Sequence, residues 1–239
     1  MNNFSYPIWL QEKNDARSAN KKSDRTRALL KVAVAELLND TPYQDLHITS
    51  ICEQANVGAG TFYRYFPSKR ELTEEVLEDV IAKFSSLMSN AGRLKRGQSM
   101  FELLTEANVT FIKFADANHG LFRCLLNADD QEYRLGSIVE RSTASWALRV
   151  TKSILRSNES LHEACTLISA HCLASMTDDI VARLTFRQDD TLRNLISDSG
   201  LDEENLAKFL AVLWHRVIFG CDPEGQAAAD YLSNEYTPI

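Results

Sequence analysis

Residues 47–72 read HITSICEQANVGAGTFYRYFPSKREL, and this stretch decides the fold of the N-terminal part of the chain. Apolar residues recur at helical spacing in two short segments of it, about 49–56 and 59–65. Between these segments, Asn56 and Gly58 suit a tight and partly left-handed turn. Helices of about eight residues are too short to be stable alone, so they must pack on another helix. The pattern therefore predicts a helix-turn-helix.

The second short helix has the features of an element that reads DNA. It begins with small residues that allow a close approach to base edges, namely Ala59, Gly60 and Thr61. Its N-terminus points free N–H groups and the positive end of the helix dipole outward, which suits phosphates. Phenol and cationic groups that can reach the DNA backbone follow, at Tyr63, Arg64, Tyr65 and Lys69.

Helical periodicity continues through the rest of the 239 residues, strand-like alternation is nearly absent, and glycine and proline number only 9 and 5. We expect an all-α fold with helices at about 24–39, 68–90, 99–118, 130–156, 160–186 and 202–219, and a short one after Gly120. The predicted parts are a flexible arm (1–23), a three-helix helix-turn-helix domain (24–72) and a larger helical domain (91–239). The helix at 68–90 links the last two.

Charge is distributed unevenly over a chain whose net charge is −7. Residues 1–98 hold 14 basic and 12 acidic side chains, whereas residues 99–239 hold 12 basic and 21 acidic ones. Within residues 13–31 the ratio is 7 basic to 2 acidic. A basic head on an acidic body favours a polyanionic partner at one end, although charge alone is equally compatible with a solvated tail.

Residues 27–72 resemble the DNA-binding head of the TetR family of transcriptional regulators. The resemblance lies in the pairs Ile51-Cys52 and Asn56-Val57, in the recognition helix Thr61–Phe66, and in Lys69–Leu72. Three departures are small. Asn56 replaces the usual turn glycine, Cys52 replaces the usual alanine, and Gly58 replaces a polar residue. The remainder of the chain is similar to the family only in length and helical layout.

This resemblance implies a cytoplasmic homodimer that represses transcription from a palindromic double-stranded DNA operator until a small-molecule effector releases it. Thr49 and Ser50 would meet phosphates, while Ala59, Gly60 and Thr61 would meet base edges. Tyr63 and Lys69 would clamp the DNA backbone, with Arg64 and Tyr65 as further contacts. For Tyr63 the alternative is half-buried packing, and for Lys69 it is a solvated lysine at a helix start.

The larger domain would hold the effector and the partner subunit. Candidate residues of the effector pocket are Phe111, Phe114, His119, Phe122, Trp146, Arg149, His171, Ser175 and Asp178. The polar ones could also face a dimer partner or water, and the aromatic ones are more often core residues. The broad apolar face that we expect at the dimer interface comprises Leu206, Phe209, Leu210, Leu213, Trp214 and Val217. The alternative is a core helix within one chain.

Two other classes of protein fit the sequence less well. An enzyme would need a catalytic or cofactor motif, and we find no GxSxG, HExxH, P-loop or GxGxxG, so we expect no enzymatic activity, cofactor or metal. A helical protein-binding adaptor with a degenerate head would lack Tyr63 or Lys69. No apolar run approaches the length of about 20 residues that a membrane span needs, so we expect none. The five cysteines are interpreted as reduced core residues, with a redox-sensing thiol as the alternative.

Overall fold

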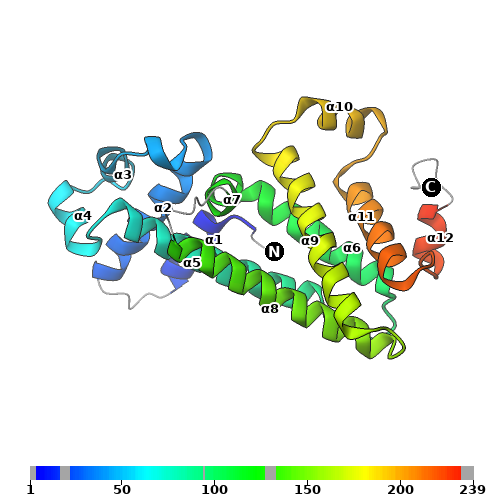
Figure 1. Ribbon diagram of the computed structural model, residues 1–239. Helices are drawn as coiled ribbons and strands as arrows, with labels where there is room; N and C mark the ends of the chain where they lie inside the picture. Colours follow the sequence, from blue (N-terminus) through cyan, green and yellow to red (C-terminus); the bar gives the residue numbers. More distant parts are fainter. Residues whose placement is uncertain (1–3, 17–21, 94, 127–132, 233–239) are drawn as a thin grey trace. The chain divides into compact units, whose positions relative to one another are not determined.

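The computed structural model describes residues 4–16, 22–93, 95–126 and 133–232 (Figure 1). Every regular element within these ranges is a helix, which confirms the all-α prediction. None of the described helices is both long enough and apolar enough to cross a membrane. The chain divides into an N-terminal unit, Met1–Lys83 with Phe114–Val139, and a C-terminal unit, Phe84–Lys113 with Glu140–Ile239.

The N-terminal unit is built around α2 (Lys22–Asp40), against which α1 (Tyr6–Ala16), α3 (Ile48–Gln54) and α7 (His119–Leu126) pack. It also contains the short 3-10 helix η1 (Tyr43–Asp45), the recognition helix α4 (Ala59–Tyr65) and the first part of α5 (Lys69–Ala91). Its core side chains are almost fully removed from solvent and include Leu30, Ile51, Phe62, Phe66 and Leu72. The two short helices thus obtain, by packing on one another and on α2, the stability that they lack alone.

The prediction of a flexible arm over residues 1–23 is wrong for residues 6–16, which form α1. Pro7 lies in the first turn, where its fixed φ angle favours a helix and its missing N–H costs nothing. Tyr6 is 0% exposed and Leu10 is also buried, so apolar burial holds the helix to the unit. Residues 1–3 and 17–21, which the predicted arm also included, lie outside the described residues.

The C-terminal unit comprises most of α6 (Met100–Ala117) and α8 (Tyr133–Ser157), together with α9 (Glu163–Thr185), α10 (Asp190–Asp198), α11 (Glu203–Phe219) and α12 (Gln226–Leu232). The predicted helices agree with these bounds to within a few residues. Two helices were not predicted, namely α12 and α10. The residue that marks the start of α10 in the sequence is Asp189, whose carboxylate accepts a hydrogen bond from the Leu192 N–H, 3.0 Å away. An aspartate at this position stabilises a helix start.

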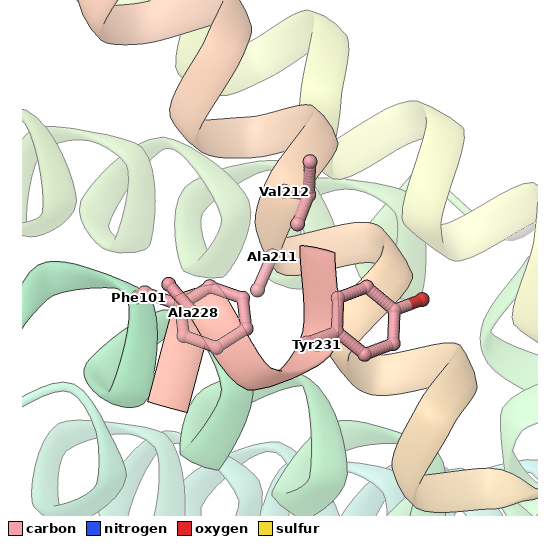
Figure 2. Packing of buried hydrophobic residues seen from close by; sticks show 5 residues of the cluster. All are labelled: Phe101, Ala211, Val212, Ala228 and Tyr231. Carbon is pink, nitrogen blue, oxygen red and sulfur yellow. The ribbon is translucent and has the colours of Figure 1, made fainter. Parts of the chain in front are cut away.

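Helix α11 supplies two buried clusters of this unit. In the first, Ala211 and Val212 pack with Phe101 of α6 and with Ala228 and Tyr231 of α12 (Figure 2). In the second, Trp214 and Ile218 pack with Ile154, Ala170 and Leu173 of α8 and α9. Helix α11 is therefore apolar on more than one side because it is a core helix of its own chain, which is the alternative that the sequence left open.

Candidate nucleic-acid interface

The sequence predicts a partly left-handed backbone in the turn between α3 and α4, at Asn56 or Gly58. The structure has this conformation at Asn56 only. Asn56 lies in the left-handed region with φ 51°, as expected. Gly58 has φ −78° and ψ 153°, a backbone conformation that any residue can adopt. A Cβ atom added to Gly58 or Gly60 would meet no atom within 4 Å. The start of α4 is therefore open to a close approach from outside.

Helix α4 turns its large apolar side chains inward and its DNA-reading candidates outward. Phe62 is 0% exposed and Phe66, which follows the helix, is 1% exposed. Tyr63 is 56% exposed, so the alternative of half-buried packing does not describe it. Exposure of the other predicted contacts varies: Thr49, Ala59, Gly60 and Arg64 are exposed, whereas Ser50, Thr61, Tyr65 and Lys69 are half-buried.

Lys69 is the predicted contact whose surroundings differ from expectation. Its Nζ donates hydrogen bonds to the carbonyl oxygens of Tyr43 (2.8 Å) and Leu46 (2.6 Å). The ammonium also lies 4.5 Å from the centre of the Tyr43 ring. Lys69 therefore ties the start of α5 to η1, the turn that leads into α3. Neither a solvated lysine nor a pure phosphate clamp accounts for these contacts.

Replacing Lys69 with methionine is expected to lower the free energy of unfolding of the N-terminal unit by about 1–2 kcal/mol, because hydrogen bonds from a charged donor are lost. It should also weaken DNA binding equally for all sequences. If Nζ contacts a phosphate as well, the slope of log affinity against log salt should fall by about 1. Urea unfolding and binding titrations at several salt concentrations measure the two effects. An unchanged slope would assign Lys69 to the turn alone.

Arg27 of α2 is a residue of this head to which the sequence assigned no individual role. Its Nη1 donates to the carbonyl oxygen of Tyr65 (3.2 Å), and its guanidinium lies 4.3 Å from the centre of the Phe66 ring. It also pairs with Glu75 of α5. Arg27 thus holds the C-terminal end of the recognition helix, a contact between residues far apart in sequence that no local pattern indicates.

The predicted effector residues are divided between the two units. Phe114, His119 and Phe122 belong to the N-terminal unit, where the rings of Phe114 and Phe122 pack edge to face. The others belong to the C-terminal unit. Phe114 is 0% exposed, so it is a core residue. Arg149 and Ser175 are exposed, and Phe111 packs against Phe84.

Trp146 and Asp178 are the pocket candidates with the most informative surroundings. The rings of Trp146 and Trp214 are perpendicular, with centroids 5.8 Å apart, and the Trp214 indole donates to the Thr177 hydroxyl (3.3 Å). The next residue, Asp178, is half-buried, and burial raises the pKa of its carboxyl to about 6. Asp178 thus follows directly on the residue that bonds the aromatic pair, and a half-buried carboxyl with a raised pKa is a candidate ligand contact.

Asp178→Asn is expected to stabilise the protein at pH 7.5 by about 1–3 kcal/mol. The carboxyl pKa rises from 3.8 in the unfolded chain to about 6 in the folded one, so the folded state holds the extra proton between these values. Stability contributed by this group is therefore present below pH 4 and lost as the pH rises through 6. Urea unfolding at pH 4 and 7.5 should show the gain only at the higher pH.

Asp179→Asn is the matched control, because the Asp179 carboxylate is 51% exposed and pairs with Arg187 at 2.6 Å. It should give no stabilisation at either pH. An equal gain for both variants would mean that burial of Asp178 is not the cause.

The described part of the chain also contains a surface groove with a volume of about 590 Å³ between α6 and the start of α11. It is lined largely by charged side chains, including Glu102, Glu106, Asp202, Glu203 and Glu204, and by none of the predicted effector residues.

Among the described residues no group of three His, Cys, Asp or Glu side chains could hold a metal. The core interpretation of the cysteines is wrong for Cys165, Cys172 and Cys221, which are exposed.

Comparison with known proteins identifies the class of the head. Residues 29–76 match the family model described as bacterial regulatory proteins, tetR family. A TetR-like transcriptional regulator from Rhodococcus sp. RHA1 has a similar structure, with a TM-score of 0.64 over 84% of this chain and 100% of the other, at 19% identity. Residues 29–76 are therefore a DNA-binding domain of the TetR family, as their sequence resemblance predicted, and the rest of the chain has a fold similar to that of a TetR-like regulator.

Two curated proteins are similar to part of the chain in sequence. Nucleoid occlusion factor SlmA of Marinomonas sp. (strain MWYL1) is 32% identical over 112 residues, which are 46% of this chain and 54% of SlmA. The HTH-type transcriptional repressor KstR of Rhodococcus jostii (strain RHA1) is 29% identical over 117 residues, 44% of this chain and 55% of KstR. The chain thus matches about half the length of each relative.

Proposed function

We propose that this protein is a DNA-binding transcriptional regulator, a repressor that a small-molecule effector releases from its operator. The observation that carries the proposal is the recognition helix. Phe62 and Phe66 anchor α4 in the core of the N-terminal unit, while Gly60, Tyr63 and Arg64 remain exposed on it. This arrangement suits insertion into a major groove.

Within this proposal the exposed start of α4 reads bases and its surroundings hold the DNA backbone. Ala59, Gly60 and Thr61 meet base edges, and Tyr63 and Arg64 reach phosphates. The exposed hydroxyl of Thr49 on α3 contacts the neighbouring strand, with Ser50 beside it. Such contacts from one short helix read few bases, so two copies on a palindromic operator are needed for specificity.

The second copy would dock on the C-terminal unit through the exposed side of α9 rather than through most of the predicted α11 face. Leu206, Leu210 and Trp214 are buried within their own chain, so they are unable to contact a partner. Of the predicted residues, Val217 is 56% exposed, and Phe209 and Leu213 are half-buried. On α9, Ile168 is 63% exposed and lies at helical spacing from the exposed Cys165, Cys172 and Ser175.

Ile168→Glu is therefore expected to convert a dimer into monomers, raising the dissociation constant of the dimer at least about 10-fold, because two carboxylates would be buried together. Analytical ultracentrifugation at micromolar concentration measures this constant. Leu195→Glu is a matched control, since Leu195 on α10 is equally exposed at 63% but lies on another helix. Equal dimerisation of wild type and Ile168→Glu would remove this face from the proposal.

The effector is proposed to be an apolar or amphipathic small molecule that binds the C-terminal unit in the cytoplasm, where the operator is. Trp146 and Asp178 are its proposed contacts, since an indole offers apolar area and one donor. Effector and operator must then weaken each other's binding, by about 5- to 150-fold for a coupling of 1–3 kcal/mol. An effector that binds together with the operator, without mutual loss of affinity, would exclude this mode of release.

The function itself is tested by a mobility shift with the DNA upstream of the protein's own gene, against a scrambled duplex of the same composition. We expect a shift that depends on sequence and weakens steeply with salt. Transcription in vitro from that DNA should decrease when the protein is added. A shift without sequence preference, or unchanged transcription, would contradict the repressor function.

A role in nucleoid occlusion is the second candidate, because 112 residues of the chain are 32% identical to the nucleoid occlusion factor SlmA. Both candidates need the same DNA-binding head. Mapping of bound sites in cells distinguishes them. A regulator should occupy a few promoters, whereas a nucleoid occlusion factor should occupy many sites whose neighbouring genes do not respond to its removal.

A further inference from the structure

The polypeptide at the start of α1 is bound by two side chains of the N-terminal unit, those of Asn118, between α6 and α7, and Lys83 of α5. Asn118, 1% exposed, donates through Nδ2 to the carbonyl oxygen of Phe4 (2.9 Å) and accepts at Oδ1 from the Tyr6 N–H (2.8 Å). Lys83 of α5 donates to the carbonyl oxygen of Ser5 (3.2 Å). Buried side chains that bond to the main chain of one short segment hold it in a single register.

Tyr6 continues these contacts toward the head. Its ring is fully buried, and its hydroxyl donates to the Asp79 carboxylate of α5 (3.1 Å). The same Asp79 oxygen accepts from Lys31 of α2 (2.8 Å). Lys31 Nζ also contacts Glu75 at 2.5 Å, and Glu75 pairs with Arg27. Two carboxylates and two cations thus form a balanced cluster, in which hydrogen bonds from Arg27 and Lys31 outweigh burial and lower the pKa of Glu75.

The last member of this series reaches the recognition helix. Arg27 donates to the carbonyl oxygen of Tyr65, the final residue of α4, and stacks on Phe66 immediately after it. A continuous series of hydrogen bonds and ion pairs therefore runs from Tyr6 through Asp79, Lys31, Glu75 and Arg27 to the end of α4. Each link joins residues of different helices, so a shift of one helix changes the partners of the next.

We propose that Tyr6 and the Asp79–Lys31–Glu75–Arg27 cluster are positioning residues that couple the docking of α1 to the orientation of the recognition helix. They touch no DNA in this proposal but act through Tyr65 and Phe66. Because coupling is reciprocal, DNA bound to α4 should also stabilise docked α1. The inference about operator affinity rests on the proposed function, whereas the coupling between α1 and α4 belongs to the free protein.

The test compares Tyr6→Phe, which removes only the hydroxyl, with Ile8→Ala. Ile8 is a suitable control because it lies on the same helix and is 50% exposed. Amide hydrogen exchange by NMR reports α1 through the Trp9 N–H, bonded to the Ser5 carbonyl, and α4 through the Phe66 N–H, bonded to the Phe62 carbonyl. In Tyr6→Phe both amides should exchange about 10-fold faster, as expected for a lost bond to a charged group, and in Ile8→Ala neither should change. Faster exchange at Trp9 alone would overturn the coupling.

Arg27→Lys tests the other end of the series, because it keeps the charge and loses the fork that spans Glu75 and Tyr65. It should accelerate exchange at Phe66 more than at Trp9. In the operator assay Tyr6→Phe should bind about 5-fold more weakly than Ile8→Ala, and unchanged affinity would overturn the link to DNA. A wild-type protein that binds no DNA would refute the proposed function, while the exchange results would still decide the coupling.

Discussion

Replacing Gly120 with alanine is expected to lower the free energy of unfolding of the N-terminal unit by about 3–5 kcal/mol, which is near the upper end for a single substitution. Gly120 lies in the first turn of α7, against the C-terminal part of α2. A Cβ atom there would lie 2.1 Å from the carbonyl oxygen of Leu38 and 2.6 Å from the amide nitrogen of Asn39. Both are main-chain atoms, so relief requires one helix to move.

The neighbouring contacts make that movement costly. Arg123, one turn further along α7, donates to the same Leu38 carbonyl oxygen at 2.5 Å. Asn118, just before α7, holds the segment that precedes α1. A displaced α7 would lose these hydrogen bonds and leave buried polar groups without partners, which adds to the steric cost. We therefore also expect the variant to lose part of its affinity for DNA.

Urea unfolding monitored by circular dichroism measures the effect of Gly120→Ala. The matched control is Gly60→Ala, because a Cβ atom at Gly60 meets nothing within 4 Å. Alanine at this helical position should be neutral or stabilising by up to about 1 kcal/mol. A cost below about 1 kcal/mol for Gly120→Ala would show that α7 and α2 separate easily, contrary to the close packing of their main chains.

Gly60→Leu should leave folding intact and reduce operator affinity by about 100-fold or more. The space around Gly60 accepts a side chain in the free protein. In the proposed complex that space is occupied by base edges, and a leucine would keep α4 out of the groove. Since each base contact contributes about 1–3 kcal/mol, losing two of them accounts for such a decrease.

Fluorescence anisotropy with a labelled operator duplex measures this decrease, with thermal unfolding in parallel to confirm that the variant is folded. Gly60→Ala should give a smaller loss than Gly60→Leu because its side chain is shorter. The loss should be larger for the operator than for a scrambled duplex, since non-specific binding depends on phosphates. Wild-type affinity in Gly60→Leu would exclude the start of α4 from base recognition.

Much of the DNA-binding head could be predicted from sequence because its signals are local. The apolar spacing of Ile51, Phe62 and Phe66 specifies which sides of two short helices are buried, and Asn56 marks the left-handed turn between them. The same reasoning placed Tyr63 on the exposed side. Lys69 was different, since its hydrogen bonds to Tyr43 and Leu46 depend on how η1 packs rather than on any repeat in the sequence.

Local pattern failed where a segment obtains its stability from distant partners. Tyr6 and its neighbours have few apolar residues and a polar continuation, which is typical of an arm, but Asp79 and Asn118 satisfy their polar groups in the fold. For a related reason, Leu206, Leu210 and Trp214 were wrongly placed on the dimer face. A helix that is apolar on more than one side predicts burial without indicating what covers each side.

The amino-acid sequence by itself therefore determined the all-helical class, the helix-turn-helix and the outward side of the recognition helix, because these follow from spacing over a few turns. Only the tertiary structure decided that α1 belongs to the head, that Gly120 must be a glycine, and that Leu206, Leu210 and Trp214 face their own core. These features depend on contacts between residues separated by many tens of positions, and helical periodicity carries no record of such partners.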